Sequence, residues 1–123
     1  MARIDNVSLS IDRSTHTAGS VCSINYSYVL HADNAEIAAS MGFSVWVEVW
    51  GKELLGDRLL GDGAFDTHTV DAAHLQRVSR HFLLPCAAMN DRIGRDVIYI
   101  CVKARSTIGV EIEQESKPVK ANF

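Results

Sequence analysis

The chain has 123 residues, of which 47% are hydrophobic and 22% are charged. This length is normal for one domain over residues 1–123, and the composition excludes an intrinsically disordered chain. The formal net charge is −3 and the basic residues are scattered among acids. No run of positive charge would neutralise a phosphate backbone, so the sequence predicts no nucleic-acid partner.

Three features bear on the compartment. Residues 1–6 have no apolar block after their arginine, so they lack the pattern of a secretory leader. The longest unbroken apolar run, residues 97–102, is too short to cross a bilayer. The 3 cysteines are an odd number, which is not typical of a secreted disulfide framework. We therefore expect a cytoplasmic protein without membrane contact, and export by a leaderless route stays an alternative.

Alternation of apolar and polar residues, the pattern of a half-buried strand, marks most of the chain. In chain order it predicts strands at residues 7–11, 22–30, 43–50, 54–60, 78–84 and 96–105, and a last strand from 110 that resumes near 119. The stretch 96–105 is apolar on both faces over its middle, which indicates a central strand. Segments rich in glycine and aspartate, at 56–66 and 90–96, predict turns.

Two segments break the alternation. Residues 33–39 begin with Asp33, and Glu36 follows three residues later in the arrangement of a capping box. Residues 71–76 have the composition of another helical turn. We expect one or two short helical turns in loops, and irregular loops are the alternative because helices this short gain little from propensity.

About seven short strands without long helices predict an all-β fold, an antiparallel β-sandwich. Tyr99 stands two residues before Cys101, and Cys22 lies in the second predicted strand. This pattern resembles immunoglobulin domains, and the tail from Tyr99 to Val119 is similar to the end of a fibronectin type III domain. The resemblance implies an immunoglobulin-like sandwich in which Cys22 and Cys101 lie opposite each other, either as a disulfide or as inert core thiols. It also implies core positions for Tyr99 and Cys101.

The strand at 43–50 carries the strongest functional signal. Phe43, Val45, Val47 and Val49 form one aliphatic face that suits a core, and Trp46, Glu48 and Trp50 lie on the other. The two tryptophans are four residues apart, so their Cα atoms are about 13 Å apart on one face. We predict that Trp46, Glu48 and Trp50 form a binding site.

Three interpretations of this face stay open. Tryptophan is enriched at the energetic centres of protein interfaces, which favours a protein partner or a homo-oligomer. The rings could instead stack on the sugars of a carbohydrate, with Glu48 accepting hydrogen bonds from hydroxyl groups or from a basic side chain. In the third interpretation a loop or the segment at 33–39 covers both rings. An exposed edge strand that adds to a neighbour's sheet is another route to assembly.

Other residues give weaker signals. The histidines (His16, His31, His68, His74, His81) show no zinc-ligand spacing, and we expect no metal and no cofactor. Turn formation explains the aspartates, although calcium at one pole of the sandwich is an alternative (Asp57, Asp62, Asp66, Asp91, Asp96). Cys86 follows Pro85, so we place it at an edge or short turn; a hydrolase or transferase built on Cys86 and a histidine is the weakest hypothesis.

The sequence therefore predicts a non-enzymatic protein-binding or assembly module. A small carbohydrate-binding domain that uses Trp46 and Trp50 as stacking platforms is the alternative.

Overall fold

Extended strands carry most of the chain, as the alternation predicts. The computed structural model of the protein describes residues 1–16, 19–52, 56–70, 75–88 and 96–121. The strands are β1 (Arg3–His16), β2 (Gly19–His31), β3 (Met41–Gly51), β4 (Arg58–Val70), β5 (Leu75–Pro85), β6 (Asp96–Ser106), β7 (Glu111–Glu115) and β8 (Val119–Ala121). Two short helical segments accompany them, α1 (Asn34–Ala38) and the 3-10 turn η1 (Cys86–Ala88).

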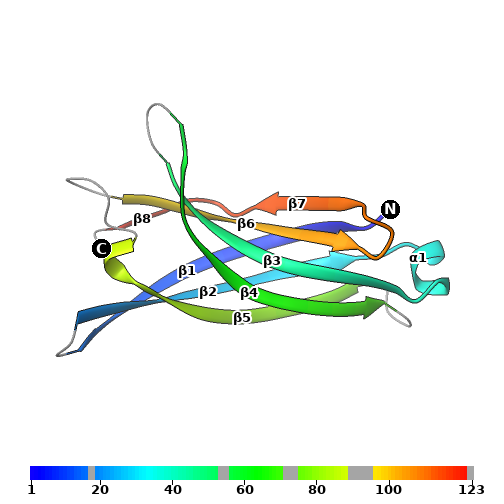
Figure 1. Cartoon of the computed structure of the whole chain (residues 1–123), viewed down its shortest axis with the longest axis horizontal. Helices are drawn as coiled ribbons and strands as arrows, with labels where there is room; N and C mark the ends of the chain where they lie inside the picture. Colours follow the sequence, from blue (N-terminus) through cyan, green and yellow to red (C-terminus); the bar gives the residue numbers. More distant parts are fainter. Residues whose placement is uncertain (17–18, 53–55, 71–74, 89–95, 122–123) are drawn as a thin grey trace.

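The strands form two sheets that lie one over the other (Figure 1). One sheet has the order β1-β2-β5, and the other has the order β4-β3-β6-β7, with β8 also paired to β6. All of these pairings are antiparallel. The predicted antiparallel β-sandwich is confirmed.

The core lies between the two sheets. Along β3, Phe43, Val45, Val47 and Val49 are at most 3% exposed, whereas the residues between them are half-buried or exposed. The same buried cluster takes apolar side chains from β2 and β6 (Ile24, Tyr26, Tyr28, Leu30, Ile98, Ile100, Val102). Each such side chain stabilises the fold by roughly 1.5–3 kcal/mol relative to exposure, so the aliphatic face of β3 belongs to the core.

Strand β4 corrects the prediction of a turn at 56–66 and of a strand at 54–60. A Cβ atom placed on Gly61 would lie 3.2 Å from the side chain of Leu84, and one on Gly63 would lie 3.2 Å from Phe82. These glycines let β4 lie close to the side chains of β5, and they sit inside a strand for that reason. Residues 53–55 lie outside the described part of the chain.

Segment α1 confirms the predicted helical turn. Asp33 Oδ1 accepts a 2.8 Å hydrogen bond from the Glu36 amide, and Glu36 Oε1 accepts a 2.9 Å bond from the Asp33 amide. Of the second predicted turn, residues 71–74 lie outside the described part and Leu75 and Gln76 begin β5. Within the described ranges no helix is long and apolar enough to cross a membrane.

Candidate functional site

The outer face of β3 holds the three predicted site residues together. Trp46, Glu48 and Trp50, called the tryptophan face from here on, are each partly exposed. Because side chains alternate along a strand, the core packing of Val47 and Val49 fixes the outward direction of these three. The fold therefore displays both indole rings on one side of the sheet.

Strand register adds residues that the sequence placed elsewhere. Across the β3–β6 pair, Trp50 lies opposite Tyr99 and Glu48 lies opposite Cys101. Directly opposite residues of an antiparallel pair point to the same face of a sheet. Tyr99 and Cys101 are buried, as expected, but they lie on the tryptophan face and outside the cluster between the sheets, so the expectation that they face Cys22 is wrong.

Glu48 organises the polar contacts of this face. Its Oε1 atom lies 3.0 Å from Lys103 Nζ and accepts a 3.2 Å hydrogen bond from the Trp50 indole N–H. Lys103 lies opposite Trp46 and also lies 3.9 Å from Glu113 Oε2. The hydrogen bond to Glu48 raises the pKa of Lys103, which keeps the ammonium charged. Glu48 thus holds both a basic side chain and one of the rings.

Tyr99 and Cys101 have little reactivity in this setting. Burial, and next the hydrogen bond to Glu113 Oε2 at 3.1 Å, raises the pKa of the Cys101 thiol to about 12. Burial also raises the pKa of Tyr99, whose hydroxyl donates a 2.6 Å hydrogen bond to Asp57. At neutral pH the thiol and the phenol are protonated, so neither is a nucleophile.

Strand β7 borders the tryptophan face with a row of carboxylates. Glu111, Glu113 and Glu115 lie opposite Arg105, Lys103 and Cys101 respectively, and so point to the same side as Trp46. A hollow of about 240 Å³ lies between Trp46 and this row, with Lys103 also in its lining. The combination of an indole ring, alternating charges and a hollow can bind polar groups that carry an apolar surface.

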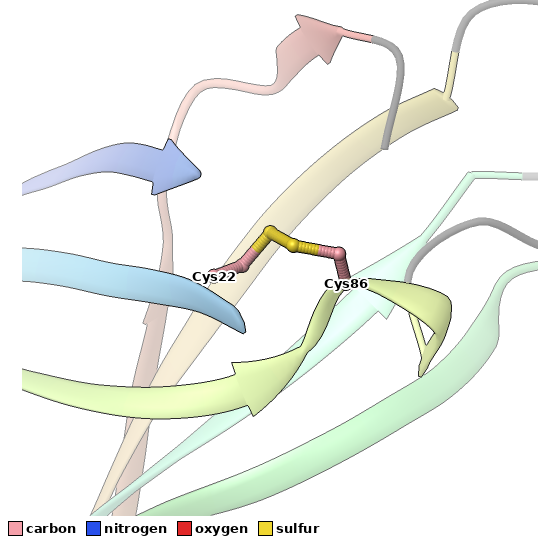
Figure 2. Close-up of a disulfide and its surroundings, with 2 residues drawn as sticks. All are labelled: Cys22 and Cys86. Carbon is pink, nitrogen blue, oxygen red and sulfur yellow. A yellow bond between two sulfur atoms is a disulfide. The ribbon is translucent and has the colours of Figure 1, made fainter. Parts of the chain in front are cut away.

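Cys22 pairs with Cys86, and Figure 2 shows the two sulfur atoms joined. The β2–β5 register puts Cys22 opposite Leu84, so Cys86, two residues further on, returns to the same face. Their Cα atoms are 5.1 Å apart, a normal disulfide separation. The expected relation between Cys22 and Cys101 is therefore wrong, and Cys101 is a free, buried thiol.

The disulfide bears on two predictions. Cys86 does lie at a short turn, η1, as predicted, but a disulfide sulfur has no thiolate to act as a nucleophile. Disulfides are typical of oxidising compartments, so the pair bears against the expectation of a reduced protein that was based on the odd number of cysteines. The cytoplasmic location stays a prediction.

Asp62 lies directly opposite Glu48 in the β3–β4 pair and therefore on the tryptophan face, whereas His68 and Asp66 are held by neighbours. His68 Nε2 lies 2.8 Å from the Tyr28 hydroxyl, and burial lowers the pKa of His68. Asp66 pairs with Arg80 at 3.6 Å between β4 and β5. In the described part of the chain no group of three or more His, Cys, Asp or Glu is placed to hold a metal ion. His74 and Asp91 lie outside the described residues.

A second hollow, the end cleft, was not predicted. It has a volume of about 280 Å³ and lies where α1, the start of β3 and the β6–β7 hairpin meet, at the end of the sandwich that carries the N-terminus (Figure 1). Its lining is mostly apolar (Ala35, Met41, Phe43, Ile108, Val110, Ile112). The only sequence signal was the pair Ile108 and Val110 beside the turn residue Gly109, an apolar composition that is unusual for a hairpin loop.

No known protein family matches the sequence, and no curated protein does. Two solved structures are similar to the chain in outline. One is a Northeast Structural Genomics Consortium target, SoR45, with 9% identity and a TM-score of 0.44 over 99% of this chain and 86% of that one. The other is Spo0M, a sporulation control protein from Bacillus subtilis, with 8% identity and a TM-score of 0.48 over 99% of this chain. The chain spans about half of Spo0M, 49% of its length.

Proposed function

We propose that this chain is a non-enzymatic binding module that docks a basic protein partner on its tryptophan face. The observation that carries the proposal is the joint placement of Trp46 and Trp50, both partly exposed, on one rigid strand. Large aromatic side chains held in place lose little conformational entropy on binding, which is why tryptophan is frequent at the energetic centres of interfaces.

The polar groups between the rings favour burial by a partner. Glu48 and Lys103 already satisfy each other at 3.0 Å, and the Trp50 indole N–H already has its acceptor at 3.2 Å. A partner that covers this face leaves no unpaired charge among them, so the cost of desolvation is reduced. Such a surface can be covered without new side-chain pairing at its centre.

Charge on the same face favours a basic partner over a second copy of the chain. Over β3, β6 and β7 the face carries four carboxylates against two cations (Glu48, Glu111, Glu113, Glu115; Lys103, Arg105). Two such faces repel each other, whereas lysine and arginine side chains complement the β7 row and can also lie over the Trp46 ring.

A non-enzymatic role fits the state of the reactive groups on this face. The Cys101 thiol has its pKa raised to about 12, and Glu48 is bound by Lys103. A nucleophile or general base needs the opposite arrangement, a lowered thiol pKa or a free carboxylate beside a substrate space.

Carbohydrate binding is the second candidate, and one observation supports it. The hollow of about 240 Å³ beside Trp46 is lined by Lys103, Glu111 and Glu113, which offers hydrogen-bonding groups next to a flat ring. A saccharide that shifts the tryptophan fluorescence of the monomer, and fails to do so in Trp46→Ala, would favour this candidate over a protein partner.

The finer fold assignment is also a proposal. The antiparallel two-sheet sandwich supports an immunoglobulin-like domain, whereas the outward placement of Tyr99 and Cys101 on β6 departs from that pattern. The Cys22–Cys86 pair departs from the pattern in which the cysteine two residues after the tyrosine takes part in the disulfide.

The test is site-specific photo-crosslinking in cells of the native host. A benzophenone amino acid at position 46 should give a discrete adduct with a basic protein, and the adduct should weaken in Glu115→Gln. The matched control places the same group at Ser10, on the outer face of the opposite sheet. Equal adducts at both positions, or none at position 46, would contradict the proposal, and an adduct with the chain itself would replace it by self-association.

A further inference from the structure

The end cleft is built from both sides by local hydrogen bonds. On the hairpin side, the Ser106 amide donates to the Val110 carbonyl at 2.9 Å, and Ser106 Oγ accepts from the Val110 amide at 3.1 Å. Gly109 has a φ of 86°, which completes the turn without strain because glycine has no Cβ. These bonds fix the backbone from which the apolar side chains of the hairpin project.

The hairpin is also fixed to β3. The Thr107 amide donates to the Gly42 carbonyl at 3.0 Å. A Cβ on Gly42 would lie 3.0 Å from the Thr107 methyl group, so glycine allows this close approach without moving the Thr107 side chain. On the other side of the cleft, the capping box of Asp33 and Glu36 fixes α1 and its Ala35. Both walls are preformed, as in ligand sites that bind without rearrangement.

The rim of the cleft exposes apolar surface that the fold does not use. Ile108 is 72% exposed and Val110 is 37% exposed, although both line the same cleft as the buried Phe43 of β3. Two neighbouring aliphatic side chains left in water beside a concave apolar surface are typical of a contact site. The volume of about 280 Å³ is below the range of drug-sized pockets and suits one large side chain.

Carboxylates line one lip of this apolar space. The backbone amide of Ala2 donates to Glu36 Oε2 at 3.0 Å, and the α-ammonium of Met1 bonds to Asp33. With the two capping-box bonds, each of the four carboxylate oxygens of Asp33 and Glu36 already accepts one hydrogen bond, and one of the donors is a cation. Two carboxylates outnumber that one cation, and each carboxylate offers about four acceptor positions, so the lip retains negative charge and acceptor capacity.

From these observations we propose that the end cleft is a second binding site, separate from the tryptophan face. It takes one large aliphatic or aromatic side chain of a partner segment whose next residue is a lysine or arginine. The apolar side chain fills the space between Ala35 and Ile112, and the basic side chain lies against Asp33 and Glu36. The preformed walls and the exposed apolar rim match the large side chain of this occupant, and the acidic lip matches its lysine or arginine.

The test uses short peptides and the whole chain, with methyl NMR shifts of Ile108, Ile112 and Met41 as the readout. N-acetyl-leucyl-lysine amide should shift these methyl signals and bind up to about fivefold more tightly than N-acetyl-leucyl-glutamate amide, the range expected for an exposed ion pair. N-acetyl-alanyl-lysine amide, which lacks the large apolar side chain, should bind more weakly than the leucyl peptide.

Two variants and one control test the apolar and the charged parts of the proposed site separately. Ala35→Leu places a larger side chain in the cleft and should abolish binding, while Ala38→Leu, on an exposed position of the same helix outside the lining, should not. Asp33→Asn keeps a good N-cap residue and should remove the preference for lysine over glutamate.

Three results would overturn the proposal. The first is the absence of methyl shifts with the leucyl-lysine peptide at millimolar concentration. The second is equal binding of the lysine and glutamate peptides to the wild type. The third is binding of hexanol as tight as that of the peptide, which would assign the cleft to small apolar molecules. None of these results bears on crosslinking at Trp46, so the two proposals fail independently.

Discussion

Lys103 on β6 reaches across the strand pair to Glu48 on β3, and their Nζ and Oε1 atoms lie 3.0 Å apart. The pair lies between the two indole rings, because Trp46 is directly opposite Lys103 and the Trp50 indole donates to the same Glu48 oxygen. The tryptophan face is therefore held by side-chain contacts as well as by the backbone of the sheet.

Neutralising Glu48 should lower the stability of the fold. Glu48→Gln keeps an acceptor for the Trp50 indole but removes the charge partner of Lys103, and we expect a loss of about 0.5–1 kcal/mol in the free energy of unfolding. Urea denaturation measures this loss, and Lys103→Met in the same chain should recover part of it. If the double variant is no more stable than the sum of the single changes predicts, the two side chains do not stabilise each other.

Cys101 should react only when the protein unfolds or the pH is very high. Ellman's reagent at pH 8 should modify little native protein and one thiol per chain after denaturation without reductant, because the pKa of Cys101 is raised to about 12. A thiol with a raised pKa stabilises the fold fully below its ordinary pKa near 9 and loses this contribution as the pH rises towards 12. Rapid modification of the native protein at pH 7.5 would contradict the burial of this thiol.

The disulfide should account for much of the stability. Cys22 and Cys86 are 64 residues apart, and closing a loop of that size stabilises the folded state by roughly 4 kcal/mol in the chain-entropy description. Replacing both cysteines by alanine should lower the free energy of unfolding by about that amount in urea. Modification of all 3 cysteines in denatured, unreduced protein would show that the bond is absent.

His68 should make the fold sensitive to mild acid. Burial lowers its pKa in the folded protein below the ordinary 6.5, so the neutral ring is favoured on folding. Its contribution is present above pH 6.5 and is lost as the pH falls through the folded-state pKa. His68→Gln should flatten the dependence of stability on pH below about 6.5, and His81→Gln, at an exposed position, is the surface control. Equal effects of the two variants would contradict the assignment.

Local patterns predicted those features that depend on a few neighbouring residues. The alternation along β3 gave its two faces correctly, and the spacing of Asp33 and Glu36 gave the capping box of α1. In both cases the information lies within one strand or one helical turn, where periodicity and capping act directly.

Features that depend on register could not be predicted in the same way. The middle of β6 is apolar on both faces, so alternation could not say that Tyr99 and Cys101 point outward; the pairing with β3 decides it. The partner of Cys22 depends on β5 lying beside β2, although β3 and β4 intervene in the sequence. The glycines of β4 were misread because a close approach and a turn select the same residue.

The end cleft depends on three segments that meet only in the folded chain. Met41, Ile108 and Ala35 come from β3, the β6–β7 hairpin and α1, and none of these segments alone shows an unpartnered apolar surface. Ile108 and Val110 beside Gly109 were the only trace of the cleft in the sequence, and apolar residues are common on protein surfaces.

The solvent access of the tryptophan face is the most direct test of the main proposal. Trp46 and Trp50 are the 2 tryptophans of the chain, so all tryptophan emission comes from this face. In dilute protein that sedimentation shows to be a 13.5 kDa monomer, acrylamide should quench this emission readily, as partly exposed rings require. Blue-shifted emission that resists acrylamide in the monomer would show that both rings are buried, and would contradict a contact surface built on Trp46, Glu48 and Trp50.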